Sequence, residues 1–273
     1  MDLDAALSRL SREPDAPLDA AELALLLARD EYPDLDVEAY LSELAGMAHE
    51  AKNYMRGTLE ARVTGLCRFL FHEMGFRGNV QEYYDARNSY LNDVLERRTG
   101  IPITLSVVAM AVGCRAGLEI VGVGLPGHFV AKAVSNDSEA IFDPFHGGRL
   151  LAPQECEYLV KQVTGVDFQA TASNLQAAPT GYILFRMLTN LKGAYLRAAD
   201  FPRAIRVIER LRQLDPGDPL QRRDLGASLL RAGQPGSAID YLASYLADLP
   251  NAPDAAEVRQ LLDRARGEVA KWN

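Results

Sequence analysis

Residues 124–148 read GLPGHFVAKAVSNDSEAIFDPFHGG, and this stretch predicts two neighbouring strands joined by a tight hairpin. It holds His128 and, fifteen positions later, Asp143, each in an apolar segment rich in the β-branched and aromatic residues typical of strands. The SNDS between the segments predicts a hairpin with Asn136–Asp137 as its two-residue loop, because both residue types tolerate a positive φ. That register puts Val130 opposite Asp143 and leaves His128 and Asp143 diagonal neighbours, about 7–8 Å apart between Cα atoms. We therefore expect a hydrogen-bonded His–Asp pair on two neighbouring strands.

The segment before these strands predicts a buried helix over Pro102–Arg115. Its sequence, PITLSVVAMAVGCR, is apolar nearly all round, which is typical of a helix at the centre of a domain. Pro102 suits the first helical position, where its missing N–H costs nothing. The glycines of GVGLPG (122–127) precede a strand rather than a helix, so we do not interpret them as a dinucleotide loop.

Residues 1–75 predict helices. Two amphipathic segments have Asp19 and Asp36 as plausible N-caps, and a third helix is expected over 58–76. His72 lies near the end of that third helix, where we interpret it as a structural residue.

From about Thr180 the chain repeats at a spacing of 34 residues, the period of tetratricopeptide repeats. The repeat rests on matched pairs of residues: Tyr195 with Leu229, Ala204 with Ala238, and Pro216 with Pro250. A terminal capping helix is expected over residues 254–272. We therefore divide the chain into residues 1–178 and residues 179–273.

The composition is that of an ordinary soluble protein, 48% hydrophobic and 24% charged. The net charge of −8 argues against nucleic-acid partners and anionic membrane surfaces. No signal peptide or membrane span is predicted, and we expect a cytoplasmic protein. Three cysteines without metal-ligand spacing indicate free thiols, and no cofactor is predicted.

The order of a central helix, a His strand and an Asp strand resembles the transglutaminase-like superfamily, which is shared with papain-type cysteine enzymes. The stretches YYDARNSYLNDVLERRTGIPITLS, GVGLPGHFVAK and FDPFHGGRLL resemble the bacterial SirB-type family, an amino-terminal transglutaminase-like domain followed by tetratricopeptide repeats. The resemblance implies an α+β, mainly helical fold, with a papain-like domain built on a small antiparallel sheet and followed by α-hairpins. It also places His128 and Asp143 on the superfamily's catalytic His and Asp.

The superfamily's nucleophilic Cys opens the central helix, where the helix N-terminus lowers a thiol pKa, but here that position falls in PITLS. Thr104 and Ser106 are weak candidates, because a hydroxyl needs a well-placed base. Cys114 lies about 16 Å further along the same helix axis, near its carboxyl end. Cys67 would have to approach from another element. The resemblance therefore implies a degenerate triad.

The missing cysteine at the nucleophile position leaves two possible functions. The preferred one is a non-catalytic scaffold that binds an unidentified protein or peptide through the repeats. The alternative is a hydrolase or acyltransferase that uses His128 and Asp143 with a Thr, Ser or recruited Cys nucleophile.

Four further residues are predicted to bind a ligand of this pocket: Asn88, Tyr90, Pro126 and Gly127. They lie in the stretches that carry the resemblance, and packing and capping are the alternative roles for the first two. His128, Asp143 and His146 form a set that can hold a metal in principle, but a turn after the Asp strand fits better and no metal is predicted. The arginines of residues 186–231 are expected on solvated helix faces, and the alternative is that some of them meet an acidic partner or the acidic first 60 residues of this chain.

Overall fold

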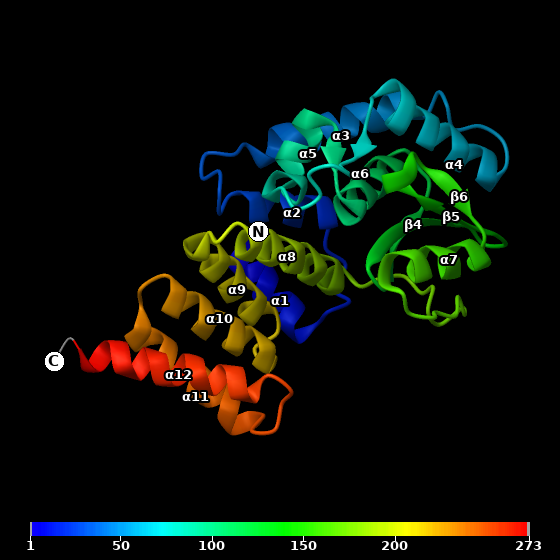
Figure 1. The fold of residues 1–273 in the computed structure, drawn as a ribbon. Helices are drawn as coiled ribbons and strands as arrows, with labels where there is room; N and C mark the ends of the chain where they lie inside the picture. Colours follow the sequence, from blue (N-terminus) through cyan, green and yellow to red (C-terminus); the bar gives the residue numbers. More distant parts are fainter. Residues whose placement is uncertain (1, 272–273) are drawn as a thin grey trace. The chain divides into compact units, whose positions relative to one another are not determined.

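The computed structural model of the chain describes residues 2–271 (Figure 1). Its helices are, in chain order, α1 (Leu3–Arg12), α2 (Ala20–Ala28), α3 (Val37–Ala51), α4 (Leu59–Cys67), α5 (Leu91–Arg97), α6 (Pro102–Arg115), α7 (Pro153–Thr164), α8 (Thr180–Arg197), α9 (Phe201–Leu214), α10 (Pro219–Arg231), α11 (Pro235–Asp248) and α12 (Ala255–Ala270). A π-helix, η1 (Arg68–Glu73), and two 3₁₀ turns, η2 (Ala86–Asn88) and η3 (Pro144–His146), complete the helical elements. The strands are β1 (Arg77–Gly78), β2 (Thr99–Gly100), β3 (Ile120–Leu125), β4 (His128–Val134), β5 (Glu139–Asp143) and β6 (Arg149–Leu151). The predicted α+β, mainly helical fold class is confirmed.

The chain forms two compact units. One comprises the residues up to Ala6 together with Pro14–Met187, and the other comprises Leu7–Glu13 and the chain from Leu188 onward. The division of the chain between residues 178 and 179 stays a prediction.

The main sheet of the first unit is antiparallel, with its strands in the order β3-β4-β5-β6. Ala131 pairs with Phe142 and Val134 with Glu139, so continuing this register places Val130 opposite Asp143. The Ser135 N–H donates to the Ser138 carbonyl over 2.9 Å and closes the two-residue loop between them. The hairpin predicted from the sequence is confirmed, together with its register.

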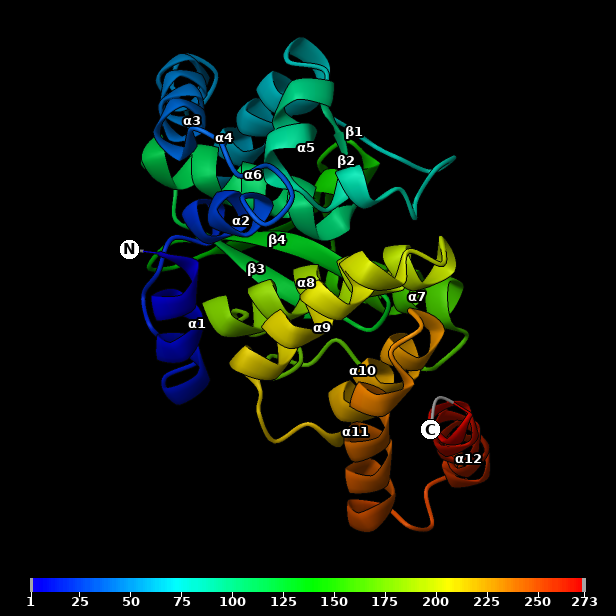
Figure 2. The same ribbon diagram turned by 90° about the vertical axis from the view of Figure 1, so that its left-hand side faces the viewer.

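The buried helix predicted over Pro102–Arg115 is α6, and it packs on β3 and β4 (Figure 2). The small side chains of Ala131 and Ala133 are buried on β4, where they allow the helix to approach closely. Gly113 of α6 also lies close to β3, since a Cβ there would lie 2.2 Å from the Ile120 Cδ1 atom. Helix α6 is therefore the centre of the unit, as its all-round apolar sequence indicates.

Helix α7 contributes a second cluster of buried side chains against the sheet. Cys156 and Val160 of this helix pack with Val123, Val130 and Ile141 of the strands. Val130 and Ile141 lie two positions along their strands from His128 and Asp143, so the site is at one end of a tightly packed layer.

The amino-terminal helices begin where the sequence predicts. The Asp19 Oδ1 atom accepts the Ala21 N–H over 2.8 Å at the start of α2, and Asp36 Oδ1 accepts the Ala39 N–H over 3.1 Å at the start of α3. These side chains supply acceptors for N–H groups that the first helical turn leaves unpaired.

The third helix, predicted over 58–76, forms over residues 59–73, but its second half is a π-helix rather than an α-helix. Helix α4 ends at Cys67, and Arg68–Glu73 is a π-helix, in which the Met74 N–H donates to the Phe69 carbonyl five residues earlier. Three consecutive side chains of this segment are buried: Phe69, Leu70 and Phe71. A π-turn holds more residues than an α-turn, so it brings consecutive side chains closer to one face.

A short parallel pair, β1 with β2, was not predicted. It lies directly beside η3. Gly78 allows this close approach because it has no side chain, and a Cβ there would lie 2.6 Å from the Phe145 ring. This contact fixes the turn that follows Asp143.

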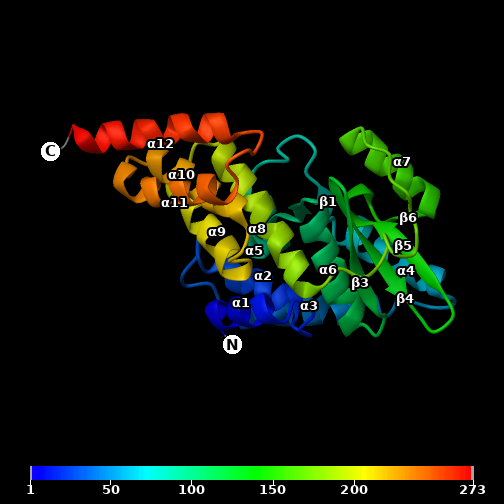
Figure 3. The same ribbon diagram turned by 90° about the horizontal axis from the view of Figure 1, so that it is seen from below.

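The second unit stacks antiparallel helices, with α10 against α9 and α11, and α11 against α12 (Figure 3). Ala204 and Ala238, which are 34 positions apart, are both completely buried, and Tyr195 and Leu229 are both buried as well. The repeat predicted from the sequence therefore matches the burial pattern. Trp272, in the predicted capping helix, lies outside the described residues, as do Met1 and Asn273.

Within residues 2–271, no helix has the length and apolar character that crossing a membrane requires.

Candidate functional site

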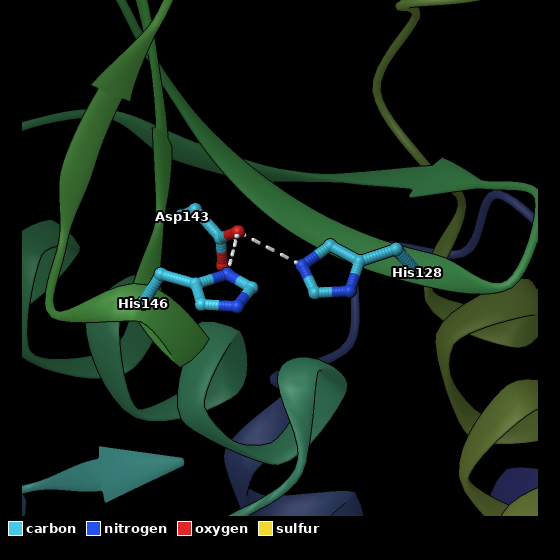
Figure 4. Close-up of side chains that lie close together, drawn as sticks. All are labelled: His128, Asp143 and His146. Atoms are coloured by element: carbon cyan, nitrogen blue, oxygen red, sulfur yellow. Dashed lines mark hydrogen bonds and ion pairs between the residues drawn. The ribbon is translucent and has the colours of Figure 1, made fainter. Parts of the chain in front are cut away.

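The predicted His–Asp pair forms, and a second histidine joins it (Figure 4). Asp143 lies between two imidazoles: its Oδ2 atom is 3.0 Å from the His128 Nε2 atom and 2.7 Å from the His146 Nδ1 atom. The two rings are stacked at an interplanar angle of 24°, with 5.8 Å between their centroids. His128 begins β4, Asp143 ends β5, and His146 ends η3, so the hairpin and the turn after it bring the three side chains together.

Asp143 is completely buried, and its other oxygen, Oδ1, accepts the Phe145 N–H over 3.0 Å. Burial acts to raise its pKa, but the hydrogen bonds from His128 and His146 outweigh this, so the pKa lies well below its ordinary value. The hydrogen bond to Asp143 in turn raises the pKa of His146 above 6.5. The carboxylate is therefore charged near neutral pH and favours the protonated form of His146.

His128 has no nucleophile bonded to its ring. Within residues 2–271, no thiol or hydroxyl makes a hydrogen bond to either of its ring nitrogens. Nε2 is held by Asp143, which leaves Nδ1 as the nitrogen that a nucleophile would have to face.

Thr104 and Ser106, the two hydroxyl candidates, are completely buried and hydrogen bonded elsewhere. Thr104 donates from Oγ1 to the Asn88 carbonyl over 2.8 Å and accepts the Ile101 N–H over 3.1 Å. Ser106 donates to the Pro102 carbonyl one turn earlier, over 2.8 Å. Both hydroxyls thus act as capping and buried hydrogen-bonding groups of α6.

The three thiols are poor nucleophiles as they stand. Burial raises the pKa of Cys67 to about 12 and that of Cys156 to about 11. Burial also raises the pKa of Cys114, whose Sγ atom contacts the backbone of Ile120. A thiolate is the reactive form, so none of the three is activated at neutral pH.

The residues predicted to bind a ligand come from two segments of the chain, Asn88 and Tyr90 before α5 and Pro126 and Gly127 between β3 and β4. The Asn88 side chain is buried and donates to the carbonyl of Glu82 over 2.7 Å. Tyr90 is buried against the edge of the Tyr32 ring. Both positions serve packing in this structure, and their ligand-binding role stays a prediction.

Pro126 and Gly127 form the exposed turn between β3 and β4, beside His128. The φ of +68° at Gly127 fits the Pro-Gly order of a type II turn. A Cβ at Gly127 would also lie 2.7 Å from the Thr164 side chain, so α7 restricts this turn to glycine.

Arg186, which is expected on a solvated helix face, is instead partly buried beside the site. Its guanidinium donates to the carbonyls of Leu125 and His128, over 3.3 and 3.2 Å, at the two ends of the β3–β4 turn. It also donates to the Tyr182 hydroxyl over 2.8 Å. Nothing in the helical pattern signals this contact, because it joins residues about sixty positions apart.

His128, Asp143 and His146 offer ligand atoms that all lie within 4.8 Å of one another, so these three residues can hold a metal ion. Asp143 already pairs with both imidazoles, which accounts for the arrangement without an ion. The absence of a metal and of a cofactor stays a prediction.

Comparisons with known proteins agree with this fold and site. The family model described as transglutaminase-like superfamily matches residues 38–189, which contain α6, the sheet and the His–Asp pair. The chain belongs to the transglutaminase-like superfamily. A tetratricopeptide-repeat model matches residues 191–263 of this transglutaminase-like protein. The predicted combination of the two parts is therefore confirmed.

The transglutaminase-like chain is similar to bacterial proteins over most of its length. It is 36% identical to the UPF0162 protein of Xylella fastidiosa strain Temecula1 over 261 residues, 92% of each chain. The UPF0162 protein of Vibrio cholerae is 28% identical over 247 residues, 88% of this chain and 91% of the relative. Human F-box only protein 21 is 32% identical over 157 residues, 54% of this chain but 24% of the human protein. No solved structure matches.

Proposed function

We propose that this transglutaminase-like protein is a non-catalytic, cytoplasmic scaffold that binds a protein or peptide partner through its repeats. The observation that carries the proposal is the environment of His128. A histidine that is oriented by a carboxylate activates a nucleophile only when the nucleophile lies within hydrogen-bond reach. Among residues 2–271, no thiol or hydroxyl is bonded to this ring.

The hydrogen bonds of Asp143 support a structural role for the remaining pair. One carboxylate ties the start of β4 to the turn η3, through His128 and His146, and also caps that turn through the Phe145 N–H. In this proposal His128 and Asp143 are the remnants of a catalytic triad that now hold a binding pocket in shape.

The repeats support the binding half of the proposal. Stacked helical repeats form extended surfaces that commonly bind other proteins. Across the second unit, Lys192 of α8 pairs with Asp224 of α10 over 2.7 Å, and Arg223 of α10 pairs with Asp254 over 2.6 Å. Leu220, near the start of α10, is 44% exposed and offers an apolar contact to a partner.

The test of binding uses the full chain as bait, with matched variants on each unit. Leu220→Asp changes an exposed apolar side chain of the repeats, and Tyr158→Asp makes the same kind of change on α7, where Tyr158 is 66% exposed. We expect a partner that the wild type and Tyr158→Asp retain and that Leu220→Asp loses. A partner lost with Tyr158→Asp alone, or no protein enriched over bait-free resin, would contradict binding through the repeats.

The test of the missing catalysis is a turnover assay on acyl and amide compounds. We expect no turnover above that of His128→Gln. Turnover by the wild type that is abolished in Cys67→Ala, Thr104→Val or Ser106→Ala would overturn the proposal and support a hydrolase or acyltransferase.

A further inference from the structure

A cleft of about 860 Å³ opens in the first unit beside the His–Asp–His group. One wall is η1, which contributes Arg68 and His72. The other is the chain from η3 to the start of β6, which contributes His146 and Arg149. Cys67 and the neighbouring chain at Gly147–Gly148 also line it.

The lining of the cleft includes four basic side chains and no acidic one, and its other side chains are those of Thr64, Cys67 and Leu150. Two arginines and two histidines face it from segments that are more than seventy positions apart in the sequence. The whole chain carries a net charge of −8 with histidines counted as neutral, whereas Arg68 and Arg149 bring two positive charges to this one cleft. The nearby carboxylates are Glu73, which pairs with Arg68, and the buried Asp143, which is bonded to His146. A concave, electropositive surface attracts anions.

Both guanidinium groups are available to a ligand. The Arg149 guanidinium makes no hydrogen bond or ion pair with any residue from 2 to 271, although the Arg149 backbone pairs with β5. Arg68 has an ion pair with Glu73, at 3.4 Å between highly exposed side chains, and pairs of this kind contribute little. A guanidinium presents several N–H donors in a plane, which matches the oxygens of a phosphate or a carboxylate.

The backbone of the cleft is fixed by close packing. Gly148 has a φ of +76°, and a Cβ at this position would lie 2.5 Å from the Cys67 Sγ atom, so only glycine lets the turn lie against α4. On the same turn, His146 is held by its hydrogen bond to the buried Asp143. The opposite wall is a π-helix, a distortion that is frequent at functional sites. The basic groups are therefore presented on a rigid frame rather than on loose loops.

We propose that this cleft binds small oxyanions, compounds that carry a phosphate or a carboxylate group, through Arg68 and Arg149 with His72 and His146 beside them. This goes beyond the proposed scaffold function, because it requires no partner on the repeats. It assigns the first unit a ligand of its own.

The experiment titrates the full chain with inorganic phosphate and, separately, with acetate, by isothermal titration calorimetry at low ionic strength. The variant Arg68→Gln/Arg149→Gln removes both guanidinium groups from the cleft. Arg56→Gln is the matched control, since Arg56 is exposed and lies outside the cleft lining. We expect binding about tenfold weaker in the double variant and unchanged in the control. The stronger of the two anions identifies the chemical group.

A second measurement uses the wild type alone and so does not depend on the folding of a variant. Phosphate is added while backbone amide signals are followed by NMR, and we expect the largest shifts at Gly147 and Gly148, which line the cleft. The proposal is overturned if neither anion binds at millimolar concentration. It is equally overturned if the double variant, folded by circular dichroism, binds as the wild type does, or if the shifts concentrate elsewhere.

Discussion

At the scale of single residues, Asp143 is the side chain on which most of the site depends. Replacing it by Asn removes the charge that His128 and His146 face. We expect Asp143→Asn to lower the free energy of unfolding at pH 6 by about 1.5–3 kcal/mol, the range for hydrogen bonds to a charged group. Urea unfolding of the two proteins measures the difference.

The pH dependence of that difference follows from the two pKa shifts. The Asp143 pKa is depressed below 3.8, so its contribution is present above that value and is lost as the pH falls through the folded-state pKa. The His146 pKa is raised above 6.5, so its contribution is complete below that value and is lost as the pH rises through the folded-state pKa. The difference in the free energy of unfolding between wild type and Asp143→Asn should therefore be largest at about pH 4–6, and it should decrease at lower and at higher pH. A gap that is constant with pH would contradict the pairing.

The two hydroxyls of α6 should differ in their contributions. Thr104→Val leaves a buried N–H of Ile101 and the buried Asn88 carbonyl without this partner, which costs about 1–3 kcal/mol. Ser106→Ala removes only a bond to the Pro102 carbonyl within the same helix, and we expect a loss below about 1 kcal/mol. Urea unfolding curves of both variants provide the comparison, and an equal or larger loss for Ser106→Ala would contradict these assignments.

At the scale of elements, two adjacent glycines allow the cost of backbone strain to be measured apart from the cost of a steric clash. Gly147 and Gly148 have nearly the same φ, +72° and +76°. A Cβ at Gly147 meets nothing within 4 Å, whereas one at Gly148 would meet Cys67 at 2.5 Å. We expect Gly147→Ala to lose about 1–2 kcal/mol from the left-handed conformation alone. Thermal unfolding should show a clearly larger loss for Gly148→Ala, and similar losses would mean that α4 does not pack against this turn.

At the scale of the whole molecule, each unit has its own core. A substitution that destabilises the repeats should therefore leave the stability of the first unit unchanged. Ala238 is completely buried in α11, and Ala238→Leu overpacks that position at a cost of about 1–3 kcal/mol. Ala247→Leu, at an exposed position of the same helix, is the control. Hydrogen exchange should show faster exchange in α10–α12 for Ala238→Leu and unchanged protection of α6. Loss of protection in both units would contradict their independence.

Much of this fold was accessible from local patterns. The bounds of α6, the caps of α2 and α3, the β4–β5 loop and the 34-residue repeat all depend on residues within a few turns of each other or on a fixed spacing. The π-helix at Arg68–Glu73 could not be predicted from local patterns. Its i to i+5 hydrogen bonding accompanies the burial of three consecutive side chains, which depends on tertiary packing and not on local helix propensity.

The meeting of His128 and Asp143 is encoded locally, because a two-residue loop fixes the register of two adjacent strands. The surroundings of the pair are set by long-range packing. This packing gave the hydroxyls of Thr104 and Ser106 backbone partners, brought Arg186 to the β3–β4 turn and set Arg68 and His72 across a cleft from His146 and Arg149. These contacts join distant segments, and they depend on how helices pack against the sheet and its turns, which no spacing along the chain encodes.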